Sequence, residues 1–141
     1  MHTAYIKKNQ YTIEFDLNGG TGIDTEITGY YGDTIPWHPN PTREHYTFDG
    51  WYNKEDGAKF DTATTTTMPD LGIDGVSITL VAKWVPDSYN IVYKDADGSD
   101  LTVAGNPSSY TYETPDFTLK NPTKKGYTFK GWTGSNGNTA D

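Results

Sequence analysis

Three aspartates around one glycine are the residues of this sequence best spaced for chemistry. The stretch KDADGSDL (Lys94–Leu101) surrounds Gly98 with three carboxylates, those of Asp95, Asp97 and Asp100. Carboxylate oxygens suit Ca²⁺, and a tight turn would gather them. The stretch lacks the full spacing of an EF-hand loop, however, and Asp-Gly is favoured in turns on backbone grounds alone. A turn is the preferred interpretation, a weak calcium site is the alternative, and no other cofactor is expected.

Histidine and cysteine form no recognisable catalytic pattern. His2 lies at the terminus, and a proline-rich stretch separates His38 from His45. The positions match neither a paired-histidine helix nor a Ser-His-Asp arrangement. The sequence has no cysteine, which excludes disulfides and thiolate nucleophiles. We therefore expect no enzymatic activity.

The charge of the chain argues against two classes of partner. The formal net charge is -8, the isoelectric point is near 4.7 and the mean hydropathy is -0.75. An acidic surface repels phosphate backbones and anionic lipid. No apolar run approaches the ~20 residues of a membrane span. We expect neither nucleic-acid binding nor membrane insertion.

One aromatic phrase occurs twice. YTFDGWY at Tyr46–Tyr52 returns as YTFKGWT at Tyr127–Thr133, each time after a Pro-Thr pair. Further upstream, YTIEFDLNGG at Tyr11–Gly20 matches YNIVYKDADG at Tyr89–Gly98. Three landmarks thus recur in the same order with a period of roughly 80 residues, which indicates a tandem repeat.

Each copy has the pattern of a strand-rich unit. Apolar and polar residues alternate along Tyr11–Leu17, and NGG at Asn18–Gly20 supplies residues that tolerate positive φ in a tight turn. The phrase Tyr46–Tyr52 predicts a further strand, and VSITLVAKW (Val76–Trp84) predicts the last one. The unit is therefore expected to be mainly β.

The segments between these strands are expected to be irregular. Three prolines from Pro36 to Pro41 interrupt strand pairing, and a single helical turn is expected near Thr42–His45. The Thr-rich Lys59–Gly75 is predicted to be an extended surface segment or a loop.

The glycine of the repeated phrase has two interpretations. The alternation of a strand puts Tyr46, Phe48 and Gly50 on one face, and Thr47, Asp49 and Trp51 on the other. The glycine would then let a neighbour lie close, or it marks a bulge. An aromatic platform for a sugar is the functional alternative, but repetition in both copies favours core packing. The expected structural residues are Gly50, Trp51, Trp84, Gly131 and Trp132.

The ordered landmarks resemble the Listeria–Bacteroides repeat family, similar to the B-repeat of internalins. The resemblance covers nearly all of Tyr11–Trp84 and, as a shorter copy, Tyr89–Thr133. It implies tandem β-grasp, ubiquitin-like repeat units, small α+β in class, with an antiparallel or mixed sheet and little helix. It also implies an extracellular, adhesin-like bacterial surface protein without catalytic residues.

The resemblance sets the expected domain boundaries. Unit 1 spans 11–84, a linker spans 85–88, and unit 2 spans 89–141 without the last strand. Residues 1–10 are a leader in which Ala4 aligns with Ala82 and Ile6 with Trp84. Two interpretations stay open: Thr3–Ile6 is the tail strand of a preceding repeat, or the leader is disordered. In the first case, strand donation would join copies head to tail.

Two functions follow as hypotheses. The preferred one is a spacer that positions another domain away from the bacterial surface, as a fragment of a larger exported protein whose neighbouring repeats are its partners. The alternative is a binding module for a host protein or glycan. Such a module would use aromatic residues outside the shared pattern, namely Tyr30, Tyr31, Trp37, Tyr110 and Tyr112.

Overall fold

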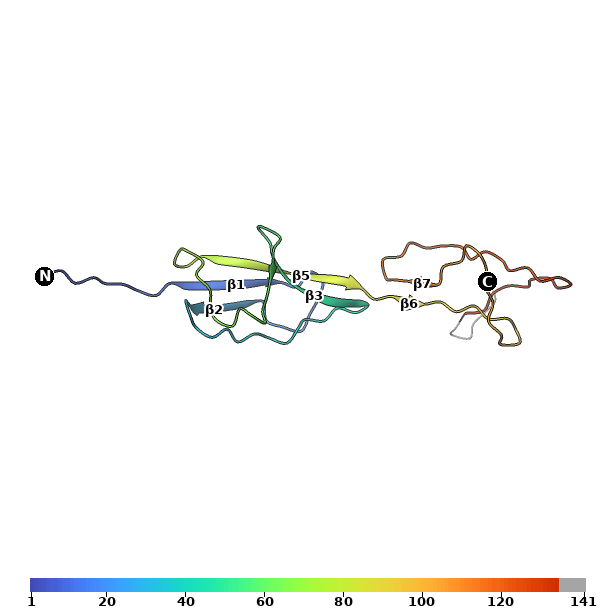
Figure 1. The fold of residues 1–141 in the computed structure, drawn as a ribbon, viewed down its shortest axis with the longest axis horizontal. Coiled ribbons are helices and arrows are strands. Elements are labelled where there is room, and N and C mark those ends of the chain that lie inside the picture. The colour runs from blue at the N-terminus through green and yellow to red at the C-terminus, as the bar shows by residue number, and fades with distance from the viewer. Residues whose placement is uncertain (135–141) are drawn as a thin grey trace. The chain divides into compact units, whose positions relative to one another are not determined.

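The computed structural model describes residues 1–134, and these contain strands and no helix (Figure 1). The predicted mainly β class is confirmed, whereas the finer β-grasp assignment stays a prediction. The chain divides into two compact units, Met1–Asp87 and Ser88–Asp141. The strands are β1 (Gln10–Asp16), β2 (Glu26–Tyr30), β3 (Tyr46–Asn53), β4 (Lys59–Phe60), β5 (Ser77–Pro86), β6 (Tyr89–Asn90) and β7 (Ser109–Tyr110).

Unit 1 is built on one mixed sheet with the strand order β2-β1-β5-β3-β4. The first and last long strands, β1 and β5, lie side by side and parallel, with Thr12 opposite Ser77 and Asp16 opposite Val81. The strands β2 and β3 pair antiparallel to β1 and β5 respectively. β5 is therefore the central strand, and it pairs along both of its edges.

The predicted alternation of β1 is confirmed. Tyr11, Ile13 and Phe15 are buried, and the residues between them are more exposed. The expected turn follows: Asn18 has φ 47° and Gly19 has φ 93°. These positive values let the chain reverse, and the Gly20 N–H donates to the Leu17 carbonyl at 2.9 Å.

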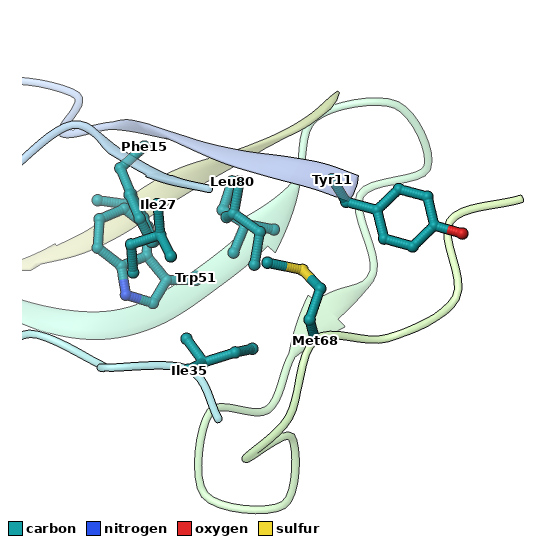
Figure 2. Close-up of a cluster of buried hydrophobic side chains, with 9 residues drawn as sticks. Tyr11, Phe15, Ile27, Ile35, Trp51, Met68 and Leu80 are labelled. Atoms are coloured by element: carbon teal, nitrogen blue, oxygen red, sulfur yellow. The ribbon is translucent and has the colours of Figure 1, made fainter. Parts of the chain in front are cut away.

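The core lies on one face of this sheet (Figure 2). Leu80 and Ala82 of β5 are 0% and 1% exposed, and Trp51 of β3 is also buried. The other layer comes from segments without strand structure, since Ile35 and Met68 close the core from loops. Figure 2 shows the Met68 side chain pointing toward Leu80. One sheet and two loop segments thus supply the buried residues of the hydrophobic core of unit 1.

The helical turn expected near Thr42–His45 is wrong. Thr42 instead pairs with Thr21 through two backbone hydrogen bonds of 2.8 and 2.9 Å. Because its carbonyl accepts from Thr21, that carbonyl is directed to another segment and not along a helix. The chain then reverses at His45, which has φ 70°, and the Tyr46 N–H donates to the Arg43 carbonyl.

The Thr-rich segment is only partly the exposed loop that was expected. It begins with β4, and Met68 within it is 1% exposed. Backbone bonds fix it to the crossover: the Met68 N–H donates to Asp33, and the Gly32 N–H donates to Met68. A third bond runs from the Ile35 N–H to the Thr66 carbonyl. These bonds hold a large apolar side chain over the sheet.

Unit 2 has a smaller sheet. β6 and β7 pair antiparallel, with Tyr89 opposite Tyr110, and the described residues of this unit contain no other named strand. β6 corresponds to β1, because Tyr89 aligns with Tyr11. The predicted lack of a last strand concerns the sequence up to residue 141, and 135–141 lie outside the described residues.

Candidate functional site

The aromatic phrase contains a β-bulge. Phe48 is opposite Trp84 and Gly50 is opposite Lys83, so Asp49 is the extra residue. Gly50 has φ 117°, a conformation that a side chain strongly disfavours. The bulge was one of the two predicted interpretations. The assignment of Phe48 and Trp51 to opposite faces is wrong, since their ring centroids lie 5.2 Å apart.

The bulge places Trp51 at the centre of an aromatic cluster. The Trp51 ring lies 4.9 Å from Phe15, and Phe48 lies 5.5 Å from Trp84. The Trp84 indole N–H donates to the Leu17 carbonyl at 3.0 Å, next to the turn after β1. Trp51 is 5% exposed and Trp84 is partly buried against the core. These side chains join β1, β3 and β5.

Gly20 is a glycine because of this cluster. A Cβ at this position would lie 2.4 Å from Cζ2 of Trp84, well inside van der Waals contact. The turn after β1 and the last strand are therefore fitted to each other. This contact gives a physical reason for the second glycine of NGG.

Unit 2 repeats the arrangement. Gly131 has φ 128°, close to that of Gly50. The Trp132 ring lies 5.2 Å from Phe129 and 5.6 Å from Tyr93. Since Tyr93 aligns with Phe15, both rings are counterparts of those around Trp51.

A second feature is shared by the two units. The Arg43 guanidinium lies 3.8 Å from the Tyr46 ring centre, and Lys124 lies 4.5 Å from the Tyr127 ring centre. The Tyr127 N–H donates to Lys124 at 3.0 Å, as the Tyr46 N–H does to Arg43 at 3.1 Å. The two units therefore share these side-chain and backbone contacts as well as the sequence motif.

Four of the five proposed ligand-facing aromatics lie at the surface. Tyr30 and Tyr31 are 43% and 52% exposed, and Tyr110 and Tyr112 are 43% and 62% exposed. Tyr110 also lies against Tyr89, with ring centroids 5.4 Å apart. Each pair of tyrosines is local to its own unit.

Trp37 differs from these four. It is half-buried, and its indole N–H donates to the Thr65 carbonyl at 2.7 Å. Its ring packs edge-on against Phe15 at 6.2 Å and Phe60 at 5.8 Å. The structure thus places Trp37 at the margin of the core.

The acidic stretch of unit 2 is a turn. The Gly98 N–H donates to the Asp95 carbonyl at 2.9 Å, and Gly98 has φ 86°. Its carboxylates are directed to different partners: Asp95 to Lys124, Asp100 to Lys94, and Asp97 to Ser99. The Ser99 hydroxyl and N–H lower the pKa of Asp97. Within residues 1–134, no three His, Asp or Glu side chains converge on a position that could hold a metal.

One shallow hollow combines an imidazole with a carboxylate. It has a volume of about 350 Å³ and is lined by Gly22, Ile23, Asp24, His38 and Pro39. Nε2 of His38 lies 4.0 Å from Asp24 and has no hydrogen-bond partner among the described residues. Among the described residues, the side chains that line the hollow include no hydroxyl.

Sequence reasoning missed one polar network. The buried Tyr11 donates its hydroxyl hydrogen to Asp70 at 2.8 Å and accepts from Asn9 at 3.0 Å. The Gly72 N–H also donates to Asp70, and these bonds, the Gly72 bond foremost, lower the pKa of this carboxyl. Tyr11 at a core-facing strand position was the available signal, because a buried hydroxyl needs a partner.

Comparison with known proteins places the chain in a family. The model of the Listeria-Bacteroides repeat domain matches residues 11–83 and again 89–141. Internalin H of Listeria monocytogenes is 37% identical over 123 residues, covering 86% of this chain and 20% of that protein.

Two further relatives come from Evansella cellulosilytica. One, named "Putative Gly-rich membrane protein", is 31% identical over 125 residues, covering 88% of this chain and 13% of that protein. The other, named "Putative membrane protein", is 32% identical over 130 residues, covering 88% and 18%. The chain spans at most a fifth of each of these three relatives. In residues 1–134, no helix is long and apolar enough to cross a membrane. With two matches that together cover most of its length, the chain belongs to the Listeria-Bacteroides repeat domain family.

Proposed function

We propose that this chain is a non-enzymatic repeat module of a bacterial cell-surface protein, where it serves as a load-bearing spacer. The family membership and the similarity to internalin H support a repeat module of a surface protein. Both relatives from Evansella cellulosilytica are named as membrane proteins, which agrees with a location at the cell envelope.

The pairing of the first and last long strands of unit 1, β1 and β5, is the main support for the proposal. The chain enters the sheet through β1 and leaves it through β5, and these strands are parallel neighbours. Tension on the two ends pulls β1 and β5 in opposite directions along their common axis. All the hydrogen bonds between Thr12–Asp16 and Ser77–Val81 then bear the load at the same time, so they cannot break one after another.

The aromatic cluster reinforces this pairing. Phe15 on β1 packs against Trp51 on β3, which is paired with Ala82 of β5. Trp84 of β5 is bonded to Leu17, just after β1. Sliding β5 along β1 would break these contacts together with the backbone bonds.

The connection between the units is short. β5 extends to Pro86, and Asp87 is bound to unit 1 through its N–H to the His45 carbonyl and its carboxylate to the Thr47 hydroxyl. Ser88 is the single residue between Asp87 and β6. Half of the predicted linker is thus strand, and so short a connection supports a semi-rigid spacer.

Force spectroscopy on the intact chain tests the proposal. The sequence has no cysteine, so a pair of cysteines can be introduced as the only attachment points for each pulling geometry. Pulling unit 1 between residue 8 and residue 87 shears β1 against β5. In the control, the force is applied between cysteines at residue 8 and at residue 31 (Tyr31→Cys). These positions lie at the open end of the β1–β2 hairpin, where Gln10 is opposite Tyr30. This control peels the pairs apart one by one.

A clearly higher unfolding force in the first geometry supports a load-bearing role. Equal forces in the two geometries would refute it, because the parallel pairing would then give no mechanical advantage.

A binding module is the second candidate function, and the exposed Tyr30, Tyr31, Tyr110 and Tyr112 favour it. Aromatic rings at a surface offer stacking faces to sugars or apolar contacts to a protein. Glycan-array binding of the chain, compared with a Tyr30→Ser/Tyr31→Ser variant, tests this function. Binding that the double substitution removes would support it, and absence of binding on the array would count against a glycan ligand.

A further inference from the structure

Two tyrosines of unit 2 lie side by side in its small sheet. Tyr89 of β6 is directly opposite Tyr110 of β7, and their ring centroids are 5.4 Å apart with an angle of 33° between the rings. The Ile91 N–H donates to the Ser108 carbonyl at 2.9 Å, which extends the pairing by one residue. Residues directly opposite in an antiparallel pair project from the same face of the sheet. The strand register therefore holds the two phenol rings together.

Unit 1 has a glycine where unit 2 has the second tyrosine. Tyr89 aligns with Tyr11, and Tyr110, counted back from the Pro-Thr pairs, aligns with Gly29. Gly29 is also the residue opposite Tyr11 in the β1–β2 pairing, so the sequence alignment and the strand register agree. The ring pair thus belongs to the second copy and is not one of the contacts that the two units share.

The exposure of these tyrosines also differs between the copies. Tyr11 is 1% exposed, and its hydroxyl is bonded to Asp70 and Asn9. Tyr89 is half-buried and Tyr110 is 43% exposed. A reagent in solution can therefore reach the ring pair of unit 2, whereas Tyr11 is shielded from it.

Two neighbouring phenols can be joined by one-electron oxidation. Each phenol loses one electron and one proton, and the two phenoxyl radicals form a carbon–carbon bond between the ring positions next to the hydroxyls. The hydrogens on those carbons then move to the oxygens, which restores two phenols in the product, dityrosine. The two electrons and two protons that are lost convert one hydrogen peroxide to two waters. Coupling is favoured when the fold already holds both rings together, because the step is then intramolecular.

We propose that Tyr89 and Tyr110 are an oxidative crosslinking site, which a haem peroxidase with hydrogen peroxide converts to dityrosine. The crosslink joins β6 to β7 and encloses residues 90–109. A two-stranded sheet is only marginally stable alone, and a covalent link between its strands restricts the unfolded chain as a disulfide does. The sequence has no cysteine, so a disulfide cannot serve this purpose. The site does not depend on the spacer function or the binding function proposed above.

Oxidation of the intact chain with a haem peroxidase and hydrogen peroxide tests the proposal. At low protein concentration, the expected product has the mass of one chain and shows dityrosine fluorescence. Tryptic digestion should then yield Trp84–Lys94 joined to Asp95–Lys120, with a mass two hydrogens below the sum of the two peptides. Fragment spectra should place the link at Tyr89 and Tyr110. A monomer whose link lies between other tyrosines, or a chain that forms no link, would overturn the proposal.

Two phenylalanine substitutions separate proximity from exposure. Tyr110→Phe keeps the ring but removes the phenol, so the yield of the joined peptides should fall at least several-fold. Tyr112→Phe is the matched control, because Tyr112 is two residues further along and is more exposed, at 62%. This control should leave the yield unchanged. Oxidation in urea should lower the yield of the parent chain, because the register no longer holds the rings together. Equal yields from Tyr110→Phe and the parent chain, or from native and urea-unfolded chain, would contradict a site built by the fold.

Force spectroscopy on the oxidised chain gives a second readout. When unit 2 is stretched between residue 88 and residue 133, the crosslinked chain should extend by roughly 60–70 Å less than the untreated chain. This is the extended length of residues 90–109, which stay inside the covalent loop. The same final length before and after oxidation would show that β6 and β7 are not joined, and would refute the proposal.

Discussion

Replacing Gly50 by alanine is the most direct test of the bulge that organises the aromatic cluster of unit 1. Gly50 has φ 117°, and conformations of this kind cost a residue with a Cβ about 1–3 kcal/mol. Alanine also stabilises by ~0.4–1 kcal/mol through its less flexible unfolded chain. The new Cβ would lie 2.9 Å from Cε of Lys59, an exposed side chain that can move aside at little cost. Taking the middle of each range, about 2 and about 0.7 kcal/mol, leaves a net loss of about 1–2 kcal/mol.

The assay is thermal and urea unfolding followed by tryptophan fluorescence. A Trp132→Phe background leaves three tryptophans, all in unit 1, so the signal reports that unit alone. For a domain of this size, each kcal/mol lowers Tm by about 4–8 °C. Gly50→Ala should therefore lower Tm by roughly 4–16 °C.

Gly29→Ala is the matched control in the same sheet. Gly29 has no positive φ, and its added Cβ would meet Met68 at an ordinary 3.6 Å. Alanine is also the better strand residue, so this variant should be unchanged or slightly more stable. If Gly50→Ala is as stable as Gly29→Ala, the bulge does not require glycine, and the physical reason given for the repeated FxGW pattern is wrong.

Three further predictions concern single contacts. Gly20→Ala should destabilise unit 1 by about 1–3 kcal/mol, because the Cβ would displace Trp84; calorimetry checks this, and a native-like Tm would contradict it. His45→Gly should raise Tm relative to His45→Ala, because residue 45 has φ 70° and unit 2 has Gly126 there; equal melting temperatures would count against strain at this turn. Asp70 has a lowered pKa in the folded protein, so this carboxyl binds a proton in the unfolded chain first as the pH falls below about 4. The ionised Asp70 therefore stabilises the fold above that pH, and this contribution is lost as the pH falls further. Asp70→Asn should therefore show a smaller drop in Tm between about pH 5 and pH 2 than the parent chain, and parallel curves would exclude this contribution.

The local sequence was sufficient for the three longest strands of unit 1 and for the family. Alternation along Tyr11–Leu17 and the apolar run Val76–Trp84 predicted β1 and β5 within two residues at each end. The Asn-Gly-Gly turn was predictable because positive φ depends on the residue itself. The internal repeat needed only a comparison of the chain with itself. The prediction that glycine and tryptophan are structural residues of the phrase also came from that repetition.

Contacts between distant segments were decided only by the tertiary structure. The alternation of β1 carries no information on its parallel partner, which begins at Ser77. The faces of Phe48 and Trp51 depend on how β3 is paired with β5, because a bulge exists only relative to a partner strand. Burial of Met68 could not be read from a Thr-rich stretch, since a single apolar residue has no periodicity. Local patterns fix which long strands form, whereas the faces of residues around a bulge, the pairing register and the closure of loops over the core depend on the whole folded unit.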